Sequence, residues 1–99
     1  MDKITITQDS KQNIEYYSNP SNRSSFISLL VSGYKMNGND VNLPVGENGL
    51  KTIIQGCCTS LKLNEPGNDF YQSLISQGYQ NLKPDELISK FLDACKNKL

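Results

Sequence analysis

Residues 50–61 read LKTIIQGCCTSL, and the apolar side chains in this stretch recur at helical spacing. Counted from Leu50, they fall three, four, seven, eight and eleven residues further on, which places them on one stripe of an α-helix. The pattern predicts an amphipathic helix from Glu47 to about Leu61 that buries one face in a core. The residues of that face are Leu50, Ile53, Ile54, Cys57, Cys58 and Leu61.

Three other stretches have helical periodicity. The first covers residues 21–33, follows Asn19-Pro20 and should end at Gly33. The second covers residues 68–77, and the third begins at Pro84, with acidic residues in its first turn. Their expected buried residues are Phe26, Ile27, Leu29, Leu30 and Val31 in the first, Phe70, Tyr71, Leu74 and Ile75 in the second, and Leu87, Ile88, Phe91, Leu92 and Cys95 in the third.

The two halves of the chain resemble each other. Residues 28–34 read SLLVSGY and residues 73–79 read SLISQGY, and a second helix follows each of them. The Gly-Tyr pairs favour left-handed caps at Gly33 and Gly78, with Tyr34 and Tyr79 packing back on the helix. An internal repeat of two helical hairpins would build a four-helix core. Chance similarity between two amphipathic helices is the alternative.

The N-terminal residues 1–18 have a different pattern. Residues 3–7 alternate apolar and polar side chains, residues 13–17 do so in part, and residues 9–12 between them are turn-like. We expect a small β-hairpin or arm here, packed on a helical domain of residues 19–99. A short helix capped by Asp9 and a disordered arm are the alternatives.

The composition favours one folded domain. The 99 residues are 36% apolar, and ten basic side chains balance ten acidic ones. The zero net charge and single arginine, Arg23, disfavour nucleic acid and anionic membranes as partners. Because no apolar run is long enough to span a membrane and no signal peptide is visible, we expect a cytoplasmic protein, unless it is secreted by another route or processed from a precursor.

Few residues offer chemistry. The chain has no histidine, and its three cysteines, Cys57, Cys58 and Cys95, are too few for a structural zinc site without another ligand. Both adjacent cysteines fall on or beside the apolar stripe, which favours reduced, buried thiols. Residues 37–42 lack the spacing of a calcium-binding loop and indicate a polar loop. We therefore expect no catalytic, cofactor-binding or metal-binding residues.

By elimination, the expected function is non-catalytic binding of another protein, as an adaptor, an inhibitor or immunity-type protein, or a recognition domain of a larger polypeptide. A homodimer is one form that such binding could take. The expected interface lies on the N-terminal hairpin, with Thr5, Thr7 and one of the neighbouring Tyr16 and Tyr17 facing outward. A small-molecule carrier or a thiol-dependent enzyme using Cys57 or Cys58 is the alternative.

Overall fold

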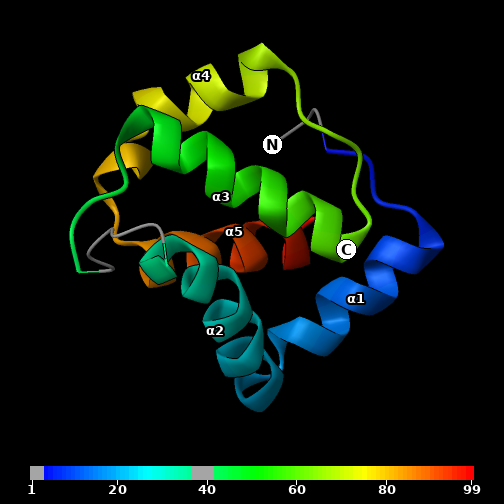
Figure 1. The fold of residues 1–99 in the computed structure, drawn as a ribbon. Helices are drawn as coiled ribbons and strands as arrows, with labels where there is room; N and C mark the ends of the chain where they lie inside the picture. The colour runs from blue at the N-terminus through cyan, green and yellow to red at the C-terminus, as the bar shows by residue number, and fades with distance from the viewer. Residues whose placement is uncertain (1–3, 37–41) are drawn as a thin grey trace.

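The computed structural model describes residues 4–36 and 42–99, apart from the side chains of residues 33–36. These residues form five α-helices and one 3-10 turn, η1 (Figure 1). In chain order they are α1 (Gln8–Ser18), α2 (Pro20–Met36), α3 (Gly46–Leu61), α4 (Asn68–Ser76), η1 (Tyr79–Asn81) and α5 (Pro84–Lys96). The prediction of a mainly helical protein is confirmed.

Helix α5 is the central element of the packing. It contacts α1, α2 and α3, whereas α4 lies next to η1 and packs the Phe70 ring against the Phe91 ring of α5. Helices α1 and α2 form a V that meets at Asn19, and α3 crosses in front of α5 (Figure 1). The Cα atoms extend over 36 × 31 × 17 Å, so the fold is flat.

The core contains every residue that periodicity assigned to the buried faces of α3 and α5. On α4, Phe70, Tyr71 and Leu74 are buried, and Ile75 is half-buried. Helix α5 begins at Pro84, as expected from its fixed backbone φ angle and missing N–H donor. On α2, by contrast, Phe26 is buried but Leu29 is exposed, so the predicted stripe was too broad.

The predicted N-terminal β-hairpin is wrong, because the described residues contain no strand and α1 occupies its place. The Thr7 hydroxyl accepts a hydrogen bond from the Ser10 backbone N–H at 3.2 Å, and the Ser10 hydroxyl accepts one from the Thr7 N–H at 2.7 Å. These reciprocal bonds satisfy donors that a helix start leaves free. The alternative prediction of a short helix named the correct type of element. The N-cap of this helix is Thr7, however, and Asp9 lies in its first turn.

The segment before α1 keeps the alternation that suggested a strand. Ile4 is buried and Ile6 half-buried, while Thr5 and Thr7 are exposed. The Thr5 N–H donates to the side-chain oxygen of Asn64 at 2.8 Å, which ties this segment to the chain between α3 and α4. The predicted alternation of buried and exposed side chains is therefore present in this segment. The segment is not a strand, however, and no strand pairs with it in the described part of the chain.

The repeat is contradicted at its first half. Helix α2 continues through Gly33 to Met36, so Gly33 does not cap a helix end. Gly78 does have the expected left-handed conformation, with φ of 83°, two residues after the end of α4. Tyr79 is buried as expected, whereas the side chain of Tyr34 and the predicted polar loop lie outside the described residues, the loop except for Asn42.

Candidate interaction surface

The two adjacent tyrosines lie near the C-terminal end of α1 and point in different directions. Tyr16 is 58% exposed, and Tyr17 is half-buried. The Tyr17 ring lies 4.5 Å from the ring of Phe26, centroid to centroid, and the Tyr16 ring meets Tyr17 edge-on at 5.0 Å. One tyrosine of the pair is exposed, as the sequence suggested, but the pair lies on a helix instead of a strand.

The structure separates the tyrosines from the other two predicted interface residues. Thr5 and Thr7 are exposed, but they precede α1, whereas Tyr16 lies near its far end. At 1.5 Å per residue, nine residues of helix put Thr7 about 14 Å from Tyr16 along the axis. These four residues therefore do not form one compact surface, and an exposed strand edge is absent from the described residues.

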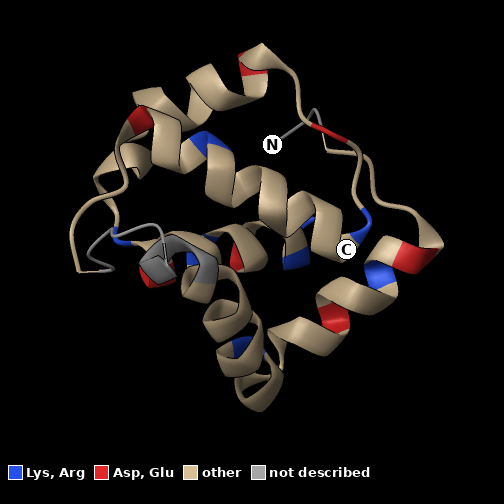
Figure 2. Cartoon of the chain, in the orientation of Figure 1, with Lys and Arg blue, Asp and Glu red and all other residues tan. Residues whose placement is uncertain are grey.

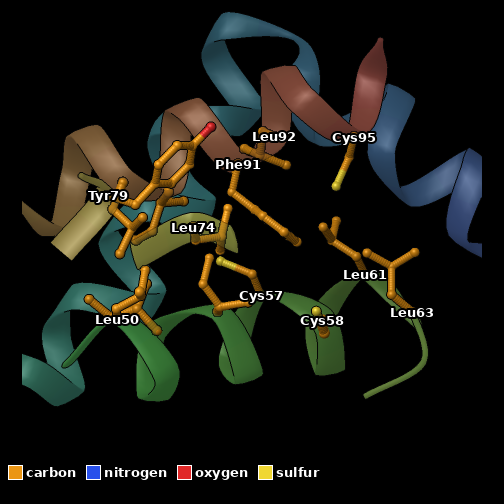
Figure 3. Packing of buried hydrophobic residues seen from close by; sticks show 14 of the residues in the cluster. Leu50, Cys57, Cys58, Leu61, Leu63, Leu74, Tyr79, Phe91, Leu92 and Cys95 are labelled. Atoms are coloured by element: carbon orange, nitrogen blue, oxygen red, sulfur yellow. The ribbon is translucent and has the colours of Figure 1, made fainter. Parts of the chain in front are cut away.

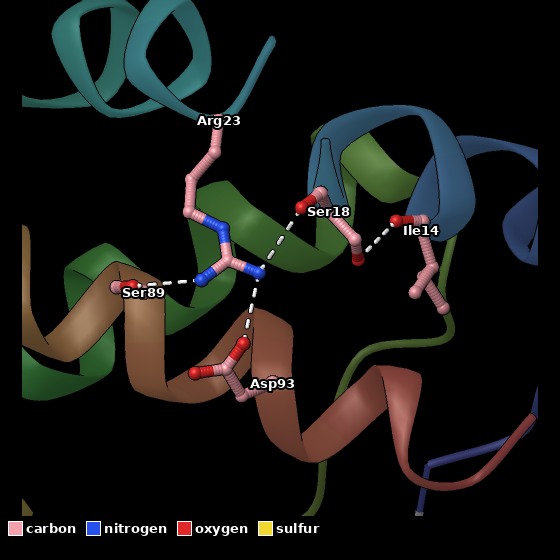
Figure 4. Close-up of polar contacts among 5 residues, drawn as sticks. All are labelled: Ile14, Ser18, Arg23, Ser89 and Asp93. Atoms are coloured by element: carbon pink, nitrogen blue, oxygen red, sulfur yellow. Dashed lines mark hydrogen bonds and ion pairs between the residues drawn. The ribbon is translucent and has the colours of Figure 1, made fainter. Parts of the chain in front are cut away.

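A polar cluster fixes the orientation of α2 on α5. The Arg23 guanidinium forms an ion pair with Asp93 at 2.8 Å and donates to the Ser89 hydroxyl at 3.0 Å (Figure 4). It also donates to the backbone carbonyl of Ser18 at 3.5 Å, at the end of α1. One side chain thus links three helices, and it directs its charge toward α5.

As a result, the outer face of α2 carries no charge between Pro20 and Ser32. Arg23 is the only charged residue in that range, and the ribbon of α2 is tan apart from one blue band before its grey end (Figure 2). The exposed residues on this part of the helix include Ser24, Ser25, Ser28, Leu29 and Ser32. This face is therefore uncharged, and it carries one large apolar side chain, Leu29, which is 65% exposed.

Asn22 links α2 to the end of α1, and Leu29 lies on the same face of α2 as Asn22. The Asn22 side chain donates to the Tyr16 carbonyl at 3.0 Å, and Leu29 follows Asn22 by seven residues, two turns along the same face. We call Tyr16, Asn22, Ser25 and Leu29 the α1–α2 surface. Leu29 was not predicted as a surface residue, because the periodicity assigned it to the core. Serines at positions 25, 28 and 32 nevertheless mark its side of the helix as exposed.

The three cysteines lie in the core instead of at a surface site (Figure 3). Burial raises the pKa of Cys57, and its neighbours Cys58 and Cys95 raise it further. Burial is also the main cause that raises the pKa of Cys58 and of Cys95 to about 12. The thiols therefore remain protonated near neutral pH, which disfavours nucleophilic attack by any of them.

The described residues contain no group of three or more cysteine, aspartate or glutamate side chains placed to hold a metal ion. Within the same part of the chain, no helix combines the length and apolar character needed to cross a membrane. No protein-family model matches this chain, and neither the curated proteins nor the solved structures contain a significant match.

Proposed function

We propose that this protein is a non-catalytic interaction module that binds another protein through its α1–α2 surface. The observation that carries the proposal is the uncharged outer face of α2, on which Leu29 is 65% exposed, together with Tyr16 near the end of the preceding helix α1, itself 58% exposed. The centres of protein interfaces are depleted of charged residues and enriched in aromatic ones. The surface has both properties.

The neighbouring residues make this surface suited to docking. The Tyr16 ring packs against the Tyr17 ring, and the Tyr17 ring packs on Phe26. Packed side chains therefore hold the exposed Tyr16 ring in place. A side chain held in place loses less conformational entropy when a partner binds. The serines beside Leu29 are small and would let a partner approach the α2 backbone closely.

The proposal can be tested by placing a photo-crosslinking amino acid at Ser25 and exposing the labelled protein to an extract of its native host. We expect a defined protein adduct, or a crosslinked homodimer, that is lost in the variants Tyr16→Ser and Leu29→Ser. Sedimentation velocity over a concentration range distinguishes self-association from binding of a different protein. Tyr17 is left unchanged in these variants because its ring packs on Phe26.

The matched control is Leu43→Ser, which removes a leucine of comparable exposure, 58%, outside the α1–α2 surface. It should leave the adduct unchanged. An adduct that survives Leu29→Ser in a folded protein, or that disappears equally in Leu43→Ser, would exclude this surface.

The alternative function, catalysis by Cys57 or Cys58, has less support because both thiols are buried with raised pKa values. A thiol reagent at neutral pH tests it directly. We expect modification of the folded protein to be slow and to become fast on denaturation. Fast modification of the folded protein would favour the enzyme.

A further inference from the structure

The outer face of α2 carries a line of residues whose spacing is the same in both directions. Asn22, Ser25, Leu29 and Ser32 follow one another at intervals of three, four and three residues, so they lie along one side of the helix. Ser25, Leu29 and Ser32 are exposed, and Asn22 is half-buried. Because the intervals are symmetric, an antiparallel second copy of α2 would bring the same four residues to matching levels.

The side chains that would meet in such a contact differ in size. Leu29 would lie opposite Ser25 of the second copy, and Asn22 would lie opposite its Ser32. Each large side chain thus meets a small one, and this alternation lets facing side chains interdigitate. Ser28, beside the line, is also small and exposed, which leaves room for the two helices to approach closely. The face is therefore complementary in shape to itself.

The charge of this face also fits a second copy. In a contact with twofold symmetry, a charged group near the axis meets its own duplicate, so a charge there would be repelled. Between Pro20 and Ser32 the only charged side chain is Arg23, and it forms its ion pair with Asp93 on α5 at 2.8 Å. Antiparallel packing also places the positive end of each helix dipole beside the negative end of the other.

The serines of this face can be covered without leaving hydroxyl donors unsatisfied. The Ser32 hydroxyl donates to the Leu29 carbonyl of its own helix at 3.1 Å. Serines within helices commonly bond in this way to a carbonyl of the preceding turn, so they need no acceptor from the partner. Covering Leu29, which is 65% exposed, removes apolar surface from water and stabilises the contact.

We propose that the partner of the α1–α2 surface is a second copy of this chain, bound by antiparallel packing of α2 on α2 about a twofold axis. The inference rests on the proposed function, because it names the partner of the same surface. Closed twofold dimers are the commonest oligomers of soluble proteins, and both copies use the same patch. Tyr16 flanks the contact, since the Asn22 side chain bonds its carbonyl beside the first turns of α2.

Disulfide formation between two variants of the full chain, Ser21→Cys and Ser32→Cys, tests the arrangement. In the antiparallel dimer, position 21 of one copy lies almost level with position 32 of the other, whereas equal positions of the two copies are about 15 Å or more apart along the axis. We expect mild oxidation to link the two variants when they are mixed, and to link neither variant to itself. The three native thiols are buried and stay in place.

The control for this experiment is Ser76→Cys, at an exposed serine on α4. Mixed with the Ser21→Cys variant, it should give no linked product, because α4 lies outside the contact. Links that form within each single variant, instead of between the two variants, would overturn the antiparallel arrangement.

Sedimentation velocity of the purified protein measures the strength of the contact, over a range from about 10 µM to about 1 mM because one pair of helices forms a small and weak interface. Leu29→Ser removes the large apolar side chain from both copies and should weaken dimerisation by at least about tenfold. Ser25→Glu, which places a carboxylate near the axis, should weaken it as well. Leu43→Ser, at a leucine that is 58% exposed outside this surface, should have no effect.

A purified protein that stays monomeric at the highest concentration, or a dimer that is unaffected by Leu29→Ser, would overturn the inference. If the monomeric protein still forms an adduct with a different host protein through position 25, only this inference fails and the proposed function stands. If position 25 forms no adduct with either a host protein or a second copy, both fail.

Discussion

Single side chains enclosed between helices account for much of the stability of this core. Phe91 is fully buried on α5, and its ring meets the ring of Phe70 from α4 almost perpendicularly, at 82° and 6.4 Å between centroids. Edge-to-face pairs of this kind add to the free energy that burial provides. Phe91 therefore joins α5 to α4 through a direct contact between rings.

We expect Phe91→Ala to lower the free energy of unfolding by about 3–5 kcal/mol, because it removes a buried ring and leaves a cavity. A urea titration followed by circular dichroism measures the change. Leu29→Ala is the control, and it should change the free energy of unfolding by less than about 0.5 kcal/mol because Leu29 is exposed. Similar losses in the two variants would place Phe91 outside the core.

The buried thiols make the stability sensitive to alkaline pH. Below pH 9, the usual pKa of a thiol, the thiols are protonated in both the folded and the unfolded states and have no effect. Between pH 9 and about 12 the unfolded chain loses these protons while folded Cys58 and Cys95 retain them, so the unfolded state is favoured. Over this pH range, each such thiol lowers the free energy of unfolding by about 1.4 kcal/mol per pH unit.

We expect these thiols to leave the urea concentration at the unfolding midpoint unchanged up to pH 9. From pH 9 to 10.5 this midpoint should fall steeply. Cys95→Ala should make this fall shallower, although its midpoint at pH 7 will be lower because of the cavity. An equally steep fall in Cys95→Ala would show that this thiol already ionises in the folded state.

At the scale of single residues, periodicity predicted burial well where the apolar stripe was narrow. All six apolar residues on α3 and all five on α5 are buried. On α2 the expected stripe covered slightly more than half of the helix circumference, about 200° at 100° per residue, and so broad a stripe does not reveal which edge faces the core. Leu29 lies at one edge and is exposed, since Arg23, near the middle of the stripe, ties that face of α2 to α5.

At the scale of helices, the ends are determined by specific backbone groups. Lys62, after α3, and Gly78, after α4, both have positive φ angles, of 61° and 83°. The Lys62 N–H donates to carbonyls at the end of α3, and the Leu63 N–H donates to the Cys58 carbonyl at 2.8 Å. These bonds satisfy acceptors that a helix end otherwise leaves free.

We expect Gly78→Val to lower the melting temperature clearly, because a β-branched residue is strained at a φ of 83°. The space is open, since an added Cβ would meet only the Asn81 side chain, at 3.9 Å. The cost is therefore conformational, and Gly78→Asn should lose less, because asparagine tolerates this region better. Equal melting temperatures for the two variants would contradict the left-handed conformation.

The N-terminal helix shows why one element could not be predicted correctly. The alternation at residues 4–7 exists, but it ends at Thr7, where two reciprocal hydrogen bonds begin α1. Serine replaces the glutamate or glutamine usual at the third position of a capping box, so the sequence signal was weak. The Gly33 error has a similar origin, since a glycine within a helix and a glycine at its end look alike in sequence.

At the scale of the whole molecule, residues distant in sequence depend on one another. Helix α1 packs on α2 and α5, and its Ile14 is fully buried. From the sequence we predicted a hairpin or arm of residues 1–18 on a helical domain of residues 19–99. The packing of α1 could not be predicted, because periodicity identifies an apolar face without identifying the helix that covers it.

We expect removal of residues 1–18 to abolish cooperative unfolding, because it uncovers the surfaces of α2 and α5 on which α1 packs. Differential scanning calorimetry measures the loss of the transition. Ile14→Ser in the full chain should lower the melting temperature, whereas Lys11→Ser, at an exposed position on the same helix, should not. A sharp transition at an unchanged temperature in the shortened chain would show that residues 19–99 fold alone.

The contact between α1 and α5 also constrains when this protein can fold during its synthesis. The ribosome makes α1 first, but the surface that covers Ile14 is incomplete until the residues of α5 have been translated. Until then the nascent chain exposes apolar faces, which favours binding by chaperones. Stalled nascent chains that end before Pro84 should therefore be digested by protease much faster than the finished protein.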